Sequence, residues 1–398
     1  MNTSHFSSPF LDILAHMTKY LGSITLYNIY IHPLSRFPGP KLWAASRIPF
    51  VLAMRSGSLV HRIRVLHETY GSVVRLAPNE VSFIDPQACR DIYGYRPGHR
   101  PFPKNQVWVP TPPKGSGKAP SILNADDEDH SRIRKAWAYG FSDKALKDQE
   151  PLIMGHVDRL ISRLHEQCRE QGTIVDIVKW YNLCVFDIIG DLAFGESFDC
   201  LERQDYHSWV AAIIHHFKAA VLMSACRYYP LLYYLLVWSI PRSSIQKQGQ
   251  HFSMVKEKVH KRLNTTQDHP DLLSHLAKAR EGLSDAEVES TAGIIIIAGS
   301  NSLTTTLAGT TNYLLRFPEA LAKLTTEIRS AYITEADITL TSLGHLPYLS
   351  AVIEEGLRIV APIPLGMPRV VPKGGDTVCG EWLPEDVSPS IRTPITLY

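Results

Sequence analysis

Apolar residues recur at three- and four-residue spacing through most of the chain, which is the pattern of amphipathic helices. This spacing predicts helices over residues 143–164, 174–193, 251–263, 319–332 and 348–360. Ser284 and Glu287 form a capping-box pattern directly before a long apolar run that continues to Pro318. The run therefore predicts one helix of about 33 residues, which would be about 50 Å long.

Strand patterns are short and lie near the two ends of the chain. Residues 73–84 (VVRLAPNEVSFI) have β-branched runs on both sides of Pro78-Asn79, which predicts a hairpin. Short strands separated by glycines are expected within residues 370–384. Residues 97–120 are rich in Pro, Lys and Gly and predict a long irregular loop, either a functional lid or a surface loop. The predicted fold class is mainly α with small β-sheets.

Two apolar segments have more than one interpretation. Residues 230–236 (PLLYYLL) are expected in the core, with a membrane surface and a substrate entrance as alternatives. Residues 10–31 are mostly apolar, but Asp12, His16 and Lys19 interrupt them. A spanning helix needs about 20 largely apolar residues, and a central charge costs about 2.5–3.5 kcal/mol. The segment predicts a weak anchor or an interfacial helix, and a soluble amphipathic helix is the alternative.

Composition narrows the protein class. The 398 residues are 44% hydrophobic and 20% charged, which fits a globular protein. The net charge of +2 and the scattered basic residues give no sign of a nucleic-acid partner. Six cysteines occur without a C-x-x-C pair or a metal-ligand cluster, which indicates a reducing compartment and no disulfide framework.

Small and polar residues interrupt the apolar run of the long helix at Ala298, Gly299, Ser300, Asn301 and Ser302. Glycine costs about 1 kcal/mol relative to alanine inside a helix, so its presence indicates close approach by something bulky. A planar cofactor and a neighbouring helix both fit that description. The hydroxyls can either bend the helix or bond a ligand.

Charged residues at helical spacing suggest further sites. Glu355 and Arg358 are three apart and can pair on one helical face. His130 and Arg134 are four apart and share a face, while Arg369 follows the helix-ending prolines of the 351–369 segment. An ordinary surface pair and a solvated basic face are the alternatives.

Five segments resemble, in order, parts of the cytochrome P450 family, the haem-thiolate monooxygenases, and most closely its fungal members that modify secondary metabolites. They are residues 32–40 (HPLSRFPGP), 126–151, 186–202 (FDIIGDLAFGESFDCLE), 293–315 and 351–369 (AVIEEGLRIVAPIPLGMPR). The resemblance covers about residues 24 to 398. It implies the cytochrome P450 fold, with a proline-rich hinge after the anchor and a long helix over the haem.

The resemblance also implies roles for the candidate residues. His130 and Arg134 would bind one haem propionate, and Arg369 would bind from the opposite strand. Glu355 and Arg358 would stabilise the core beside the haem.

Ala298, Gly299, Asn301 and Ser302 would line the oxygen site. The family has an acid and a threonine where this chain has Asn301 and Ser302. Because an amide cannot relay a proton as a carboxylate can, we expect slow or leaky oxygen activation.

One family element has no counterpart in this sequence. The family holds iron through a cysteine in a Phe-x-x-Gly-x-Arg-x-Cys-x-Gly loop, and the only cysteine after Arg358 is Cys379, in an unrelated setting. We therefore expect a cytochrome P450 fold that is incomplete at the C-terminus, with no metal ligand assigned. Cys379 as the iron ligand is the least favoured interpretation.

These inferences combine into one prediction. Residues 1–31 are expected to be the weak anchor or interfacial helix, 32–384 the truncated cytochrome P450 domain and 385–398 an atypical tail. The function expected is haem-dependent hydroxylation of a lipophilic fungal metabolite, at the cytosolic face of the endoplasmic reticulum membrane. NADPH-cytochrome P450 reductase would supply electrons. The alternative is an inactive remnant that binds a lipophilic ligand, or a gene-model artefact.

Overall fold

The computed structural model describes residues 9–171, 174–207, 221–265, 269–277 and 282–391. The chain divides into two compact units, one formed by Met1–Trp108 with Pro364–Pro394 and the other by Val109–Ile363 with Ile395–Tyr398. Helices predominate, and the described strands all lie in the first unit. The prediction of a mainly α fold with small sheets is confirmed.

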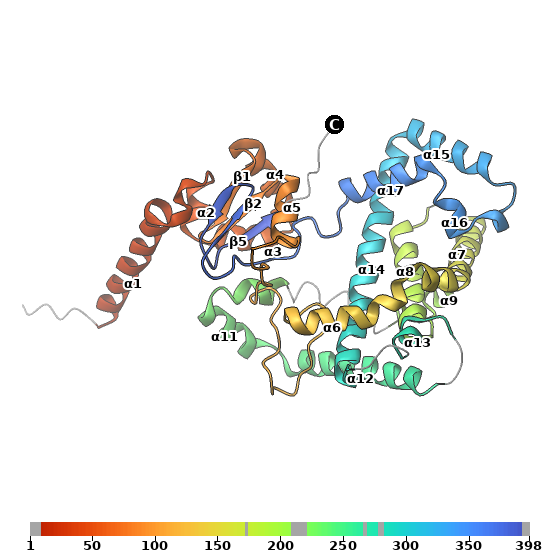
Figure 1. The fold of residues 1–398 in the computed structure, drawn as a ribbon, viewed down its shortest axis with the longest axis horizontal. Coiled ribbons are helices and arrows are strands. Elements are labelled where there is room, and N and C mark those ends of the chain that lie inside the picture. The colour runs from red at the N-terminus through yellow and green to blue at the C-terminus, as the bar shows by residue number, and fades with distance from the viewer. Residues whose placement is uncertain (1–8, 172–173, 208–220, 266–268, 278–281, 392–398) are drawn as a thin grey trace, which may run out of the picture. The chain divides into compact units, whose positions relative to one another are not determined.

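The first unit is built around a three-stranded sheet (Figure 1). Strands β1 (Val73–Ala77) and β2 (Glu80–Phe83) form the predicted antiparallel hairpin, and β5 (Ser388–Ile391) pairs with β2 in parallel. A separate hairpin joins β3 (Asp376–Val378) to β4 (Glu381–Leu383). The helices of this unit are α1 (Pro9–Leu26), η1 (Tyr27–Ile31), η2 (Pro33–Arg36), α2 (Lys41–Ala45), α3 (Ile48–Arg55), α4 (Leu59–Tyr70) and α5 (Pro86–Tyr93).

The second unit is helical, and its longest element is α14 (Asp285–Arg316). This helix has 32 residues and begins at the predicted capping box of Ser284 and Glu287, so the prediction of one very long helix is confirmed. The other helices are α6 (Asp127–Trp137), η3 (Ala138–Phe141), α7 (Asp143–Gln171), α8 (Ile177–Phe194), α9 (Cys200–Arg203), α11 (Pro230–Ser239), α12 (Arg242–Leu263), α13 (Leu272–Ala277), α15 (Pro318–Ala331), η4 (Glu335–Asp337), α16 (Leu340–Leu343) and α17 (Pro347–Ile359).

The core of the second unit lies where α14 packs against α8 (Figure 1). Val288, Ala292 and Ile296 follow one another at four-residue spacing on α14 and are fully buried in one cluster with Leu183 and Phe186 of α8. Burying these side chains stabilises the fold by about 1.5–3 kcal/mol for each of the larger ones. This buried stripe fixes which face of α14 is left for other contacts.

The expectation that residues 230–236 lie in the core is wrong. They form the start of α11, in which no residue is buried. Leu231 is 76% exposed and Trp238 is 87% exposed. A short run that is apolar at every position has no periodicity to mark a buried face. Its sequence therefore does not distinguish a core position from an exposed one.

Only α14, among the described helices, has the length and hydropathy of a membrane span. α14 packs against α8, α12 and α17, and part of its apolar surface lies in the core of the helical unit. This finding concerns α14 and does not test the N-terminal anchor, which stays a prediction.

Candidate functional site

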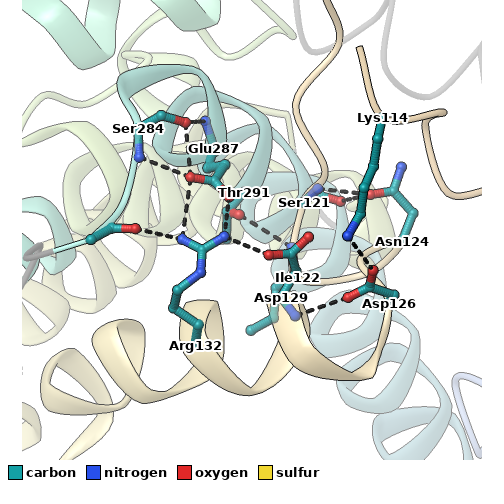
Figure 2. A network of polar contacts seen from close by, with 11 residues as sticks. Lys114, Ser121, Ile122, Asn124, Asp126, Asp129, Arg132, Ser284, Glu287 and Thr291 are labelled. Atoms are coloured by element: carbon teal, nitrogen blue, oxygen red, sulfur yellow. Dashed lines mark hydrogen bonds and ion pairs between the residues drawn. The ribbon is translucent and has the colours of Figure 1, made fainter. Parts of the chain in front are cut away.

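Arg132 connects α6 to the beginning of α14 (Figure 2). Its Nη2 donates to Asp129 Oδ1 at 2.7 Å and to Glu287 Oε1 at 2.5 Å, and its Nη1 donates to the carbonyl of Gly282 at 2.6 Å. Glu287 also accepts from the backbone N–H and the hydroxyl of Ser284, both at 2.8 Å. One carboxylate thus caps α14 and holds α6 against it.

These contacts change the acidity of Glu287. Burial alone would raise the pKa of its carboxyl group, but the hydrogen bonds from Arg132 and from Ser284 outweigh burial and lower the pKa below its ordinary value. The carboxylate form is therefore the form that stabilises this junction.

The loop before α6 is also bonded to α14. The backbone N–H of Ile122 donates to the hydroxyl of Thr291 at 3.2 Å. This bond lies beside the Ser121–Asn124 turn (Figure 2). Asp126 caps α6 by accepting from the N–H of Asp129 at 2.9 Å. The bond from Ile122 to Thr291 and the cap made by Asp126 thus hold the start of α6 in place.

His130 and Arg134 lie one turn apart on α6. His130 is partly buried, whereas Arg134 is exposed. The guanidinium of Arg134 makes no hydrogen bond or ion pair with the residues that the structure describes. Its donors are free for an anionic ligand, for which the planar guanidinium is well suited.

Arg369 belongs to the first unit. Its Nη1 donates to the carbonyl of Phe102 at 3.2 Å, and its guanidinium carbon lies 5.7 Å from the centre of the Tyr93 ring. Its Nε is buried without a hydrogen-bond partner among the described residues. An unpaired buried donor is costly, so Arg369 retains capacity for a further acceptor.

The polar residues in the middle of α14 mostly bond to the helix itself. The hydroxyls of Ser300 and Ser302 donate to the carbonyls of Ile296 and Ala298, at 2.7 and 2.6 Å. A serine hydroxyl has one proton but two lone pairs. Ser302 can therefore accept a hydrogen bond as it stands, but it can donate to a ligand only after leaving its backbone partner.

Gly299 is explained by a neighbouring helix. A Cβ at this position would lie 2.9 Å from Cδ1 of Ile189 on α8. Of the two interpretations of this glycine, helix packing is the one that the structure shows. Ala298 is exposed, and Asn301 and Ser302 are partly exposed, so these three lie off the buried stripe of α14.

Glu355 and Arg358 form a bidentate ion pair on α17. Nε of Arg358 donates to Oε2 of Glu355 at 2.6 Å, and Nη2 donates to the other oxygen. These hydrogen bonds lower the pKa of the Glu355 carboxyl group. The side chains are 50% and 27% exposed, so in this structure they pair at the surface of the helix.

Gly356, between these two residues, was not identified from the sequence. A Cβ here would lie 2.2 Å from Oγ1 of Thr310 on α14. The glycine therefore allows α17 to approach α14, and it determines where the ion pair is held. A glycine inside a helical pattern was the available signal, since it implies a packing reason.

The segment 186–202 has a structural role. The carboxylate of Asp187 on α8 is fully buried and accepts from the backbone N–H groups of Cys200 and Leu201, both at 2.8 Å. Gly190 leaves room for the ring of Phe198, which would lie 2.7 Å from an added Cβ. The polar residue and the glycine of this segment thus fold the chain back onto α8.

Cys379 lies in the turn between β3 and β4, and its N–H donates to Asp91 at 2.8 Å. Burial and the nearby carboxylates of Asp85 and Asp91 raise the pKa of its thiol to about 11. A site that opposes the thiolate is unsuited to ligating iron. The described residues contain no group of three or more side chains placed to hold a metal ion.

A family model for cytochrome P450 matches residues 38–386. The chain belongs to the cytochrome P450 family. It is 42% identical over 374 residues to cytochrome P450 monooxygenase efuB of Hormonema carpetanum, an alignment that covers 92% of this chain and 74% of the relative.

Two further cytochrome P450 relatives have names that state a reaction. Averantin hydroxylase of Dothistroma septosporum is 37% identical over 96% of this chain and 73% of its own length. Trichothecene C-4 hydroxylase of Trichoderma arundinaceum is 40% identical over 95% of this chain and 75% of its own length. These relatives support a monooxygenase, and family membership implies haem.

Some of the described residues suit haem and one does not. The free guanidinium of Arg134 and the unpaired Nε of Arg369 are suitable donors for haem carboxylates. Cys379 does not fit as the iron ligand, for the reasons given above.

Proposed function

We propose that this cytochrome P450 hydroxylates a lipophilic fungal secondary metabolite, with electrons from NADPH delivered by NADPH-cytochrome P450 reductase. The observation that carries the proposal is the extent of the family match, from residue 38 to residue 386. The names of the two hydroxylases support the type of reaction.

Bound haem would supply the oxygen-activating chemistry of the enzyme. Arg134 and His130 would hold one propionate through one face of α6, and Arg369 would contribute a second guanidinium. The support for these roles is donor chemistry: a guanidinium pairs with a carboxylate through two parallel hydrogen bonds.

Asn301 and Ser302 would limit proton delivery at the oxygen site. The Asn301 amide can orient a ligand by hydrogen bonding but has no titratable proton. Ser302 uses its proton on the carbonyl of Ala298. Both features favour slow or leaky turnover, in which reducing equivalents are consumed without product.

Asn301→Asp tests this assignment by restoring a carboxylate. In the haem-loaded enzyme we expect more product per NADPH consumed. Asn312→Asp makes the same chemical change on an exposed part of α14 and is the matched control. An equal yield from Asn301→Asp and the wild type would contradict the role given to Asn301.

The reduced carbon-monoxide difference spectrum tests the proposed function as a whole. The full chain is produced with added haem precursor, and a thiolate-type Soret band would show that one of its cysteines ligates the iron. Such a band should survive in Cys379→Ala, because that thiol is unsuited to iron. Absence of any band would refute the proposal and favour the alternative of a non-catalytic protein that binds a lipophilic ligand.

Membrane association at the cytosolic face of the endoplasmic reticulum is also part of the proposal. On α1, Met17, Leu21 and Ile24 follow helical spacing and are exposed. An exposed apolar stripe of this kind suits the boundary between headgroups and acyl chains.

A further inference from the structure

Tyr93, the last residue of α5, links that helix to the segment before Arg369. Its hydroxyl donates to the carbonyl of Met367 at 2.8 Å. Gly366 has a φ of 66°, in the left-handed region, and an added Cβ there would lie 2.6 Å from the Tyr93 hydroxyl oxygen. Glycine suits both that backbone conformation and so close an approach. The backbone of the segment before Arg369 is therefore shaped around the tyrosine hydroxyl.

The ring of Tyr93 lies against the side chain of Arg369. The guanidinium carbon is 5.7 Å from the ring centre, which is within the distance of about 6 Å expected for a cation–π contact. The ring is itself held in place, because Tyr93 packs against the apolar cluster of the first unit that includes Ile92 and Phe102. Burial raises the pKa of Tyr93 to about 12, so the hydroxyl keeps its proton at neutral pH and goes on donating to Met367.

The guanidinium of Arg369 is fixed at one nitrogen and keeps donors at the others. Nη1 donates to the carbonyl of Phe102 at 3.2 Å. That carbonyl is held in turn, because the N–H of Val370 donates to the carbonyl of the next residue, Pro103, at 2.9 Å. Nε and Nη2 have no hydrogen-bond partner among the residues that the structure describes. The Nε–Nη2 edge can therefore bind a carboxylate through two parallel hydrogen bonds.

We infer that Tyr93 is a positioning residue for Arg369, which it holds so that the Nε–Nη2 edge meets a carboxylate of the cofactor. Tyr93 acts through the arginine and does not contact the carboxylate itself. The inference rests on the proposed role of Arg369 in binding haem and adds the residue that sets this role. The physical reason is conformational entropy: a long side chain that is ordered beforehand loses less freedom when its ligand binds.

Iron-free porphyrins test the carboxylate contact without depending on an iron ligand. Protoporphyrin IX carries the propionate carboxylates of haem, whereas its dimethyl ester carries none. The full chain is titrated with each compound in the same buffer with dilute detergent, and porphyrin fluorescence gives the two affinities. Arg369→Gln should weaken binding of the acid at least about tenfold, the factor contributed by a hydrogen bond to a charged group, and leave binding of the ester unchanged. Arg100→Gln, at an exposed position in the same unit, is the matched control and should change neither affinity.

Substitutions of Tyr93 measure what the tyrosine adds. Tyr93→Leu removes the ring and the hydroxyl and should weaken binding of the acid about fivefold, the factor of a cation–π contact, with no change for the ester. Tyr93→Phe keeps the ring and its packing and loses only the bond to Met367, so its loss should be smaller. Tyr95→Leu is the matched control, because Tyr95 is 93% exposed, and it should have no effect.

The double variant of Tyr93→Leu with Arg369→Gln separates positioning from a general structural role. If Tyr93 acts through Arg369, Tyr93→Leu has no further effect once the guanidinium is gone, because residues that act together couple. A further loss of acid binding in the double variant would overturn the inference. Equal losses of acid and ester in Tyr93→Leu, or an unchanged preference for the acid, would also overturn it.

The same titrations separate the inference from the function on which it rests. If Arg369→Gln leaves the preference for the acid unchanged, the proposed role of Arg369 is wrong and the inference falls with it. If Arg369→Gln removes that preference and the Tyr93 variants keep it, only the inference is wrong. The expected porphyrin affinities, together with no Soret band in the reduced carbon-monoxide spectrum, would support the inference while refuting the proposed hydroxylase.

Discussion

Gly356 offers a sharp test of how α17 is seated on α14. In Gly356→Ala the new Cβ would lie 2.2 Å from Oγ1 of Thr310 and 3.3 Å from its Cβ and Cγ2. Rotating the threonine gives only partial relief, because its Cβ stays 3.3 Å from the added Cβ in every rotamer. At the same crossing, a Cβ on Gly309 would lie 2.5 Å from Cγ1 of Val360, so the two helices have little freedom to shift.

Two effects of opposite sign determine how much Gly356→Ala changes the free energy of unfolding. Alanine is favoured over glycine in a helix by about 1 kcal/mol, whereas overpacking costs about 1–3 kcal/mol. Because the contact is so short, we expect the crowding to dominate and the net loss to be about 1 kcal/mol. Gly155→Ala on α7 is the matched control, since nothing lies within 4 Å of its added Cβ. That variant should be more stable than the wild type by up to about 1 kcal/mol.

Urea unfolding followed by far-ultraviolet circular dichroism measures both variants, with equal slopes indicating a comparable change in exposed surface. The substitution Thr310→Ala, which removes the crowded hydroxyl, should recover part of the stability lost in Gly356→Ala. A midpoint for Gly356→Ala at or above that of the wild type would refute the reasoning. The reasoning would also be refuted if the stability changes of the two single substitutions simply added in the double variant, because contacting residues are expected to couple.

Two other predictions follow from buried or paired carboxylates. Asp187→Ala should destabilise the protein by about 2–5 kcal/mol in the same assay, because two buried N–H donors lose their acceptor. The control is Asp158→Ala, at an exposed position on α7, which should change stability by less than about 0.5 kcal/mol. Because the folded pKa of Glu287 lies below its ordinary value of 4.5, its stabilisation is complete above about pH 4.5 and is lost as the pH falls through the folded pKa. Arg132→Gln should therefore lose less stability than the wild type between neutral and acidic pH; parallel acid titrations of the two proteins would contradict this.

The elements with local signals were predictable from the sequence. The capping box of Ser284 and Glu287 marks its own helix start, and Pro78-Asn79 marks the hairpin turn. The Glu355–Arg358 pair follows from helical spacing alone. Each of these features depends on residues only a few positions apart.

Features that depend on distant partners were not predictable. β5 contains Pro389 and has no clear alternation, and it becomes a strand only because β2 offers it an edge. Its edge position explains why proline is tolerated there. The exposure of α11 and the contact of Gly356 with Thr310 likewise depend on what lies opposite them in space. Helical spacing showed that His130 and Arg134 share a face, but their proposed role and that of Arg369 in binding haem came from family resemblance.

The parallel pairing of β2 with β5 has a consequence for how the protein is made. Glu80 is paired with Ser388, so the sheet joins positions separated by about 300 residues. While the chain is being synthesised, β2 has an unpaired edge until the last of those residues has left the ribosome. An unpaired strand edge is a site for association with other chains, and closing so long a loop has a larger entropic cost than closing a short one. The helical unit can assemble in that interval, but the sheet cannot be completed, so we expect the β2 edge to be the point at which nascent chains most need chaperone protection.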